Sequence, residues 1–274
     1  PDGQIVRDEH GRPSGVLLEG AMRLVENLIP PPTLQELVAA LEHALPIANR
    51  AGLTGVHDFD SPLLFGACQV LHQRQQLSLR VTKSIPLDRL DEAIALGLRT
   101  GFGDDWLRIG PVKMFADGAL GPRTALMLEG YDSAPQDTGI AATDIEEIRQ
   151  AVSRAAAAGL ACAIHAIGDK ANRQVLDVYE GVMRNDVMRD DVMRHRIEHA
   201  QLLHPDDMGR LGRLGVIASM QPIHATSDML MVDRDWGKRG AGAYAFKTLL
   251  DYNTVLAFGS DCPVESLEPL AGIH

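Results

Sequence analysis

Regular alternation of short apolar segments with helical ones predicts an α/β fold, a TIM-type (β/α) barrel, for most of this 274-residue chain. The apolar segments lack the alternating polar residues of a half-exposed sheet, which is typical of parallel strands covered on both faces. Hydrophobic residues make up 45% of the chain and aromatic residues only 4%, so aliphatic side chains must fill the core. No glycine-rich phosphate loop follows the first strand, and its absence favours a barrel over an open doubly wound sheet.

Residues 1–32 predict an N-terminal hairpin or insertion that precedes the barrel. Two short apolar segments flank a turn at residues 8–11, which is the pattern of a hairpin. Thr33 then begins a helix, and Glu36 three residues later completes a capping box. We therefore assign residues 33–274 to the barrel.

Seven strands are expected in the barrel region, each followed by a helix or a long loop. The strands are expected at 53–57, 79–85, 107–115, 160–167, 195–200, 215–220 and 254–259. The helices are expected at 33–52, 63–76, 87–99, 143–158, 170–184, 205–214 and 243–251, with polar loops at 118–142 and 222–240. Because a barrel of this type has eight strands, we interpret these as strands 2 to 8, with strand 1 upstream of the sequence.

Composition excludes several classes of partner. Lys and Arg number 26 against 37 Asp and Glu, and no basic run occurs, so we expect no nucleic-acid partner. No apolar run approaches the ~20 residues that span a bilayer, so we expect no membrane segment. The three cysteines, Cys68, Cys162 and Cys262, form no CxxC pair, which indicates a reducing cytoplasm rather than a disulfide framework.

The polar residues at the strand ends indicate chemistry, because the active sites of such barrels lie at the carboxyl ends of the strands. Lys113 lies in the third expected strand, His165 and His199 end two later strands, and Asp261 follows the last one. Imidazole, carboxylate and carbamate oxygens are good ligands for divalent zinc, manganese or iron. A purely structural explanation would need four independent coincidences, so the pattern predicts a metal site.

Lys113 has two interpretations that this segment alone does not separate. A lysine inside an apolar strand is costly to bury in its charged form. Its side chain either reaches a carboxylate such as Asp117, or it is functional, as a Schiff-base amine or as a carbamate formed with CO2. The Schiff-base interpretation leaves the other three strand-end residues unexplained.

The order Lys, His, His, Asp across successive strands resembles the amidohydrolase superfamily, in its branch containing N-substituted formamide deformylase and related exoenzyme-like amidohydrolases. Five segments carry the resemblance, in the family's order: Val112–Gly118, His165–Asp169, Arg196–Ala200, Ser219–His224 and Gly259–Pro263. The similarity covers nearly the whole chain. It implies a metal-dependent hydrolase of amide or other C–N bonds in small molecules, with one or two divalent ions, zinc being the expected metal.

The resemblance also implies roles for the strand-end residues. Lys113 would be a carboxylated lysine that bridges two metals, and His165 and His199 would bind the second metal. Asp261 would bind the first metal and act as general base toward the metal-activated hydroxide that attacks the carbonyl.

Three further positions are candidates with structural alternatives. His224 would reach the carbonyl oxygen or the substrate, or it is a loop histidine bonded to Asp228. Arg123 would contact the substrate, or it is a surface arginine. The pair His57 and Asp58 would orient the metal ligands, or it is structural.

The sequence departs from the family pattern in two respects. It contains no HxH pair, which the family carries at the end of strand 1, and it lacks most of the flanking β-sandwich. This leaves two alternatives: a mononuclear deaminase-like hydrolase, or a truncated, metal-poor barrel that acts as an interaction module. A barrel without strand 1 has two unpaired edges, so we expect a homodimer or aggregation.

Overall fold

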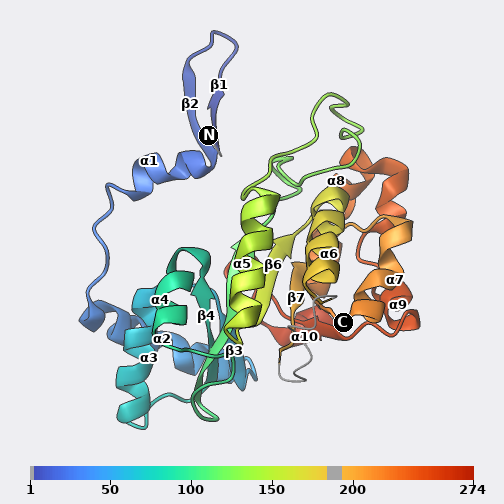
Figure 1. Cartoon of the computed structure of the whole chain (residues 1–274). Coiled ribbons are helices and arrows are strands. Elements are labelled where there is room, and N and C mark those ends of the chain that lie inside the picture. Colours follow the sequence, from blue (N-terminus) through green and yellow to red (C-terminus); the bar gives the residue numbers. More distant parts are fainter. Residues whose placement is uncertain (1–2, 184–192) are drawn as a thin grey trace.

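The computed structural model describes residues 3–183 and 193–274. Seven parallel strands form one sheet in which each strand pairs with the next along the chain, in the order β3 to β9. The strands are β3 (Gly55–Asp58), β4 (Arg80–Pro86), β5 (Leu107–Phe115), β6 (Cys162–Ala166), β7 (Arg196–His199), β8 (Ile217–Met220) and β9 (Leu256–Phe258). The sheet curls into a half-barrel with helices along its outer side (Figure 1), which confirms the predicted TIM-type fold with seven parallel strands.

Helices connect most of the strands and cover the sheet. They are α2 (Leu34–Arg50), α3 (Pro62–Gln73), α4 (Leu90–Ala95), α5 (Ile145–Ala157), α6 (Asp169–Met183), α7 (Pro205–Leu214), α8 (Pro222–Asp235), α9 (Phe246–Asp251) and α10 (Pro269–Ile273). The predicted capping box is present at the start of α2, where the Thr33 hydroxyl accepts from Glu36 N and the Glu36 carboxylate accepts from Thr33 N. No helix in the described ranges is both long and apolar enough to cross a membrane.

Two predictions of local structure were wrong. The expected polar loop at 222–240 is mostly the helix α8, followed by the 3-10 helix η3 (Gly237–Gly242). Pro222 suits the first turn of α8, and Val232 and Trp236 are buried against the loop that follows β5, so tertiary packing stabilises this helix. The helix expected at 87–99 is shorter, because Gly97 takes a left-handed φ of 69° that stops it.

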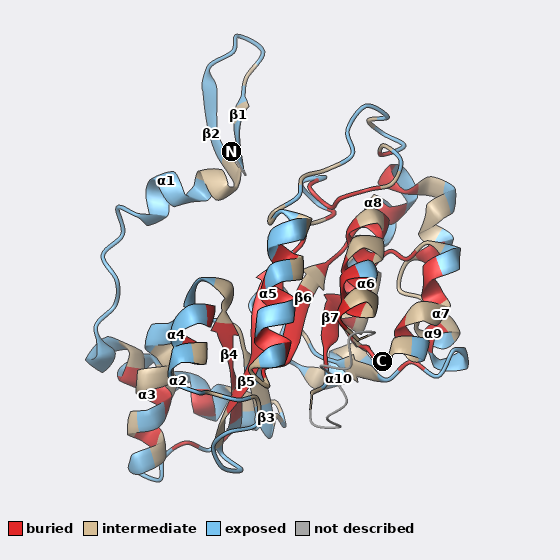
Figure 2. Ribbon diagram, viewed as in Figure 1, coloured by how far each residue is buried: buried red, intermediate tan, exposed pale blue. Residues whose placement is uncertain are grey.

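Burial differs strongly across the sheet. All four residues of β7 are buried, whereas the residues of the edge strands β3 and β9 are half-buried or exposed. Figure 2 shows the same contrast, with buried residues concentrated on the central strands β6 and β7 and on the helix sides that face them. The main hydrophobic core therefore lies between the central strands and helices α5, α6 and α7.

The N-terminal segment forms the predicted hairpin and lies apart from the sheet. Strand β1 (Gly3–Arg7) pairs antiparallel with β2 (Pro13–Glu19), and the 3-10 helix η1 (Gly20–Met22) and the short helix α1 (Arg23–Glu26) follow. Most of these residues are exposed (Figure 2). At the base of the hairpin, the Thr124 hydroxyl donates to Glu19 Oε1 over 2.7 Å, which ties the hairpin to the loop after β5.

Candidate active site

The central strands bring three of the predicted ligands together. The register between β5 and β6 pairs Phe115 with His165, two residues beyond Lys113. The register between β6 and β7 pairs Ala166 with His199. The imidazole rings of His165 and His199 lie edge to face with their centroids 4.5 Å apart. Adjacent parallel strands therefore place the lysine and both histidines at one end of the sheet, as the sequence predicted.

Lys113 is buried among aromatic rings rather than paired with a carboxylate. Its Nζ lies 3.9 Å from the centroid of the Phe115 ring and 5.2 Å from that of Phe59. Burial lowers the pKa of Lys113 to about 8, although the carboxylates of Glu198 and Asp261 act in the opposite direction. The amine is therefore partly neutral near pH 8.

The alternative in which Lys113 reaches Asp117 does not occur. Asp117 accepts hydrogen bonds from three backbone amides instead: Leu126 N at 2.8 Å, Ile167 N at 3.0 Å and Gly168 N at 2.8 Å. Burial raises the pKa of Asp117 to about 7, and the three amides oppose that rise. This carboxyl group joins the loop after β5 to the loop after β6. The sequence places Asp117 correctly after a strand, but it gives no sign of the distant amides it would join.

His165 is neutral and anchored to a backbone oxygen. Its Nε2 lies 2.8 Å from Gly118 O and 3.6 Å from Asp117 Oδ1. Burial lowers its pKa to about 3, and Lys113 adds to the effect. Because a carbonyl oxygen only accepts hydrogen bonds, Nε2 carries the proton, and Nδ1 keeps a free lone pair.

His199 ends β7 in a left-handed conformation with φ of 73°. Its Nδ1 lies 2.8 Å from Oε1 of Gln221, a residue that the sequence did not single out. Burial holds the pKa of His199 well below its usual value, with smaller effects from His165 and Lys113. The ring of His224 lies nearly parallel to it, at 6.0 Å between centroids.

His224 is part of helix α8 and not of a loop. Its side chain is buried, and its Nε2 has no hydrogen-bond partner among the described residues. Asp228, the partner expected in the structural alternative, instead accepts from Gln201 and from Tyr244. The buried, unpartnered nitrogen of His224 is available to a ligand.

Asp261 follows the edge strand β9 and is the most accessible of the four predicted ligands. It has a left-handed φ of 56°, and its side chain is exposed. Partial loss of solvent still raises its pKa above the usual carboxyl value, while His224 and Lys113 lower it. Both residues are therefore close enough for their charges to act on this carboxylate.

His57 and Asp58 each contact a different residue. Nδ1 of His57 lies 3.1 Å from a guanidinium nitrogen of Arg196. Asp58 forms a buried ion pair with Lys83 over 2.8 Å. These contacts favour the structural interpretation of the pair.

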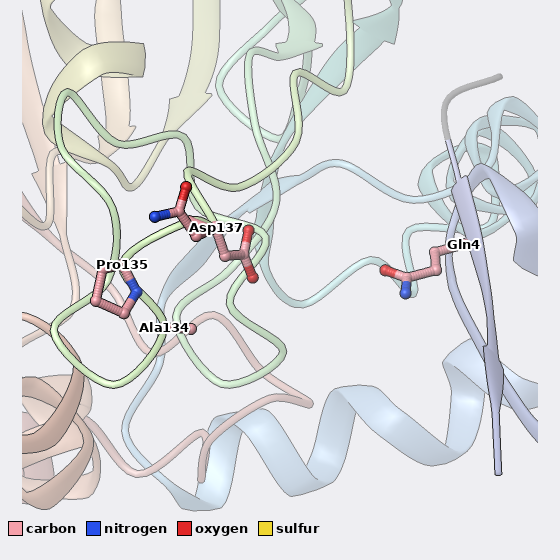
Figure 3. A pocket seen from close by; sticks show the side chains of 5 residues that line it. Gln4, Ala134, Pro135 and Asp137 are labelled. Carbon is pink, nitrogen blue, oxygen red and sulfur yellow. The ribbon is translucent and has the colours of Figure 1, made fainter. Parts of the chain in front are cut away.

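Arg123 lies away from the four predicted ligands. It is exposed on the loop after β5, and its guanidinium reaches the Ser133 hydroxyl at the long distance of 3.5 Å. It lines a surface hollow between this loop and the N-terminal hairpin. Figure 3 shows a neighbouring part of this gap, with Gln4 of β1 facing Asp137 across it. Neither hollow is lined by any of the predicted metal ligands.

The donors that do converge fit part of a divalent metal centre. Within residues 3–183 and 193–274, no three His, Cys, Asp or Glu side chains are arranged to hold an ion by themselves. Yet His165 and His199 are adjacent and held neutral, which is the form of imidazole that binds metals. Lys113 lies beside them, and a carbamate on its Nζ would add the missing anionic oxygens. The chemistry of the set thus suits a metal once Lys113 is modified.

The parallel half-barrel thus carries Lys113 near the end of β5, His165 and His199 on β6 and β7, and Asp261 after β9. The family model described as the amidohydrolase family matches residues 1–274, and the chain therefore belongs to that family. This confirms the resemblance seen in the sequence.

Individual proteins agree with the family assignment. Protein LONG AFTER FAR-RED 3 of Arabidopsis thaliana is 35% identical and covers 99% of this chain and 49% of its own length. YtcJ of Bacillus subtilis is 32% identical, over 100% of this chain and 52% of that protein. The crystal structure of an uncharacterized metal-dependent hydrolase from Pyrococcus furiosus has a TM-score of 0.81 at 31% identity, and the match covers 97% of this chain and 55% of that one. The chain thus spans about half the length of these relatives.

Proposed function

We propose that this chain carries the metal-binding and catalytic residues of a hydrolase that cleaves amide or other C–N bonds of small molecules. The observation that carries the proposal is the contact between the neutral imidazoles of His165 and His199 beside the buried amine of Lys113. Lys113, His165, His199 and Asp261 would hold one or two divalent ions, with zinc the expected metal. A bound zinc ion would lower the pKa of a water molecule and polarise the scissile carbonyl.

Lys113 is suited to become a carbamate. Its buried amine has a pKa of about 8, so about a tenth of it is neutral and nucleophilic at pH 7, and about half at pH 8. The ammonium group first loses one proton to solvent. The neutral amine nitrogen then forms a bond to the carbon of CO2 and loses a second proton, which leaves an anionic carbamate in place of a cation. A positively charged Lys113 beside His165 and His199 would repel a metal ion, whereas the carbamate would be an anionic ligand of that ion.

Asp261 is assigned as the group that moves protons during hydrolysis. Its raised pKa makes it a better base than an ordinary carboxylate, and its position at the open end of the sheet gives substrate access. The carboxylate takes a proton from the attacking water as the water oxygen bonds to the carbonyl carbon, and delivers it to the nitrogen as the C–N bond breaks. The unpartnered Nε2 of His224 is assigned to the carbonyl oxygen, and Arg123 to a more distant part of the substrate.

The proposal is tested by hydrolysis of a panel of N-acyl and N-formyl amines, using chain reconstituted with zinc and bicarbonate. We expect amine release, with Asp261→Asn slower by roughly 100-fold or more because a positioned base contributes about that factor. Asp251→Asn is the matched control, because Asp251 pairs with Lys247 on the surface of α9. Zinc-loaded chain that hydrolyses none of these substrates, or an Asp261→Asn variant as active as the control, would contradict the proposal.

A further inference from the structure

Gln221 lies between the end of β8 and the start of α8, and its side chain contacts His199. Its side chain is buried, with 7% of the residue exposed. Its Oε1 lies 2.8 Å from His199 Nδ1, and its Nε2 donates to Ser219 O at 3.4 Å. One carboxamide thus joins the histidine at the end of β7 to the backbone of the neighbouring strand.

We propose that Gln221 is a positioning residue that keeps His199 in the form protonated at Nδ1, so that the Nε2 lone pair would be free to bind a metal ion. Metal binding by the Nε2 lone pair rests on the proposed function, whereas the presence of the proton on Nδ1 does not. In many proteins, an acceptor that bonds to the other ring nitrogen orients a metal-binding histidine in this way.

The orientation of the amide follows from its two contacts. A carboxamide oxygen only accepts hydrogen bonds, so the ring nitrogen that faces it must carry a proton. Rotating the Gln221 amide by half a turn would instead place its oxygen against the carbonyl of Ser219, and two acceptors repel each other. The Ser219 carbonyl therefore selects the orientation that presents Oε1 to His199.

The environment of His199 makes this single contact decisive. In a neutral imidazole with one proton, a proton on Nδ1 leaves the Nε2 lone pair free. The neighbouring rings of His165 and His224 pack against it, but among the described residues Gln221 supplies the one hydrogen bond to its imidazole. Without the amide oxygen of Gln221, the His199 ring could carry its proton on either nitrogen and could rotate about its side-chain bonds.

The test is two-bond 1H–15N correlation NMR of zinc-free chain labelled with 15N-histidine, with the His199 signals identified by their loss in His199→Ala. In the wild type we expect a proton-bearing Nδ1 and a proton-free Nε2. Gln221→Met, which keeps the length and removes the acceptor, should mix the two tautomers. Gln221→Glu should retain the Nδ1–H form, because one carboxylate oxygen still accepts from the ring, although its other oxygen faces Ser219 O and should lower stability.

Gln201→Met is the matched control, since Gln201 is a buried glutamine that bonds Asp228 and not His199. A second readout is zinc affinity against a competing chelator, where we expect Gln221→Met to weaken binding by about 10–100-fold and the control to leave it unchanged. A wild-type His199 protonated at Nε2 would overturn the proposal even if Gln221→Met failed to fold. So would a folded Gln221→Met whose His199 tautomer is unchanged. A correct tautomer without zinc binding would instead count against the proposed function alone.

Discussion

The central strands of the sheet and its edge strands differ in burial and in the predicted metal ligands that they carry. Strand β7 is wholly buried, whereas β9 is half-buried or exposed. Lys113, His165 and His199 come from the buried centre, where packing on both sides fixes their geometry. Asp261 follows β9, which pairs with β8 on one side only among the described residues. The buried core therefore holds Lys113, His165 and His199 from both sides, whereas the proposed general base Asp261 follows a strand with a single neighbouring strand in the described part of the chain.

The same contrast holds for polar contacts. At the centre, buried groups such as Asp117 and His195 have backbone partners inside the protein. In the outer parts, the capping box of α2 is exposed to solvent and the hairpin contact at Thr124 is only partly buried. The contrast leads us to expect large effects from central substitutions and progressively smaller ones toward the periphery.

The largest effect on stability is expected for Asp117→Ala. This variant leaves three buried amides without their acceptor, and each unsatisfied group costs about 1–3 kcal/mol. We expect the free energy of unfolding in urea to fall by roughly 3 kcal/mol or more. Asp105→Ala is the control, because the Asp105 side chain is 95% exposed. Equal stability of the two variants would show that the loops after β5 and β6 do not depend on this carboxyl group.

Acid should destabilise the core through His195. Burial lowers its pKa from 6.5 to about 4, and its Nδ1 accepts from Cys162 N over 3.1 Å. His195 therefore binds a proton more readily in the unfolded chain than in the folded one. Its contribution to the free energy of unfolding is fully present above pH 6.5 and decreases as the pH falls toward 4. The difference corresponds to roughly 3 kcal/mol.

The measurement for His195 is urea unfolding at several pH values between 7 and 4. The variant His195→Asn does not titrate in this range and keeps a side-chain oxygen as acceptor, so its stability should fall less steeply with acid. An unchanged pH slope in this variant would mean that other buried groups, such as His57, account for the acid sensitivity.

A smaller effect is expected where the N-terminal hairpin meets the loop after β5. Thr124→Val removes the hydroxyl that donates to Glu19 and accepts from Ala119 N over 2.9 Å. Because one partly buried amide loses its partner, we expect a loss of about 1–2 kcal/mol. Thr124→Ser keeps the hydroxyl and should retain most of this stability. A Thr124→Val variant that unfolds at the wild-type urea concentration would exclude an energetic role for the contact.

The smallest effect is expected at the start of α2. Thr33→Ala removes the capping hydroxyl, and such losses cost about 1 kcal/mol. Thermal unfolding followed by circular dichroism should show a small decrease in midpoint for this variant and none for Thr33→Ser. A decrease as large as that of Asp117→Ala would contradict the contrast between centre and periphery.

The sequence was most informative where local pattern and chemistry coincide. Short apolar strands that end in His165 or His199 could be recognised because strand ends meet at one edge of a parallel sheet. The contacts of Asp117 and Gln221 could not, since their partners are distant in the chain and no local pattern marks them. Helix α8 was missed for a similar reason: its apolar residues form no regular stripe, and it is stabilised by the packing of Trp236 against the loop after β5.

The most direct test of the account is metal content per chain, measured by inductively coupled plasma mass spectrometry after reconstitution with zinc and bicarbonate. We predict one or two zinc ions in the wild type, lost in His165→Ala and in His199→Ala. His72→Ala should bind as the wild type does, since His72 lies on α3 and contacts Asp104. A wild-type chain without zinc, or His165 and His199 variants that keep it, would contradict a metal centre on the central strands.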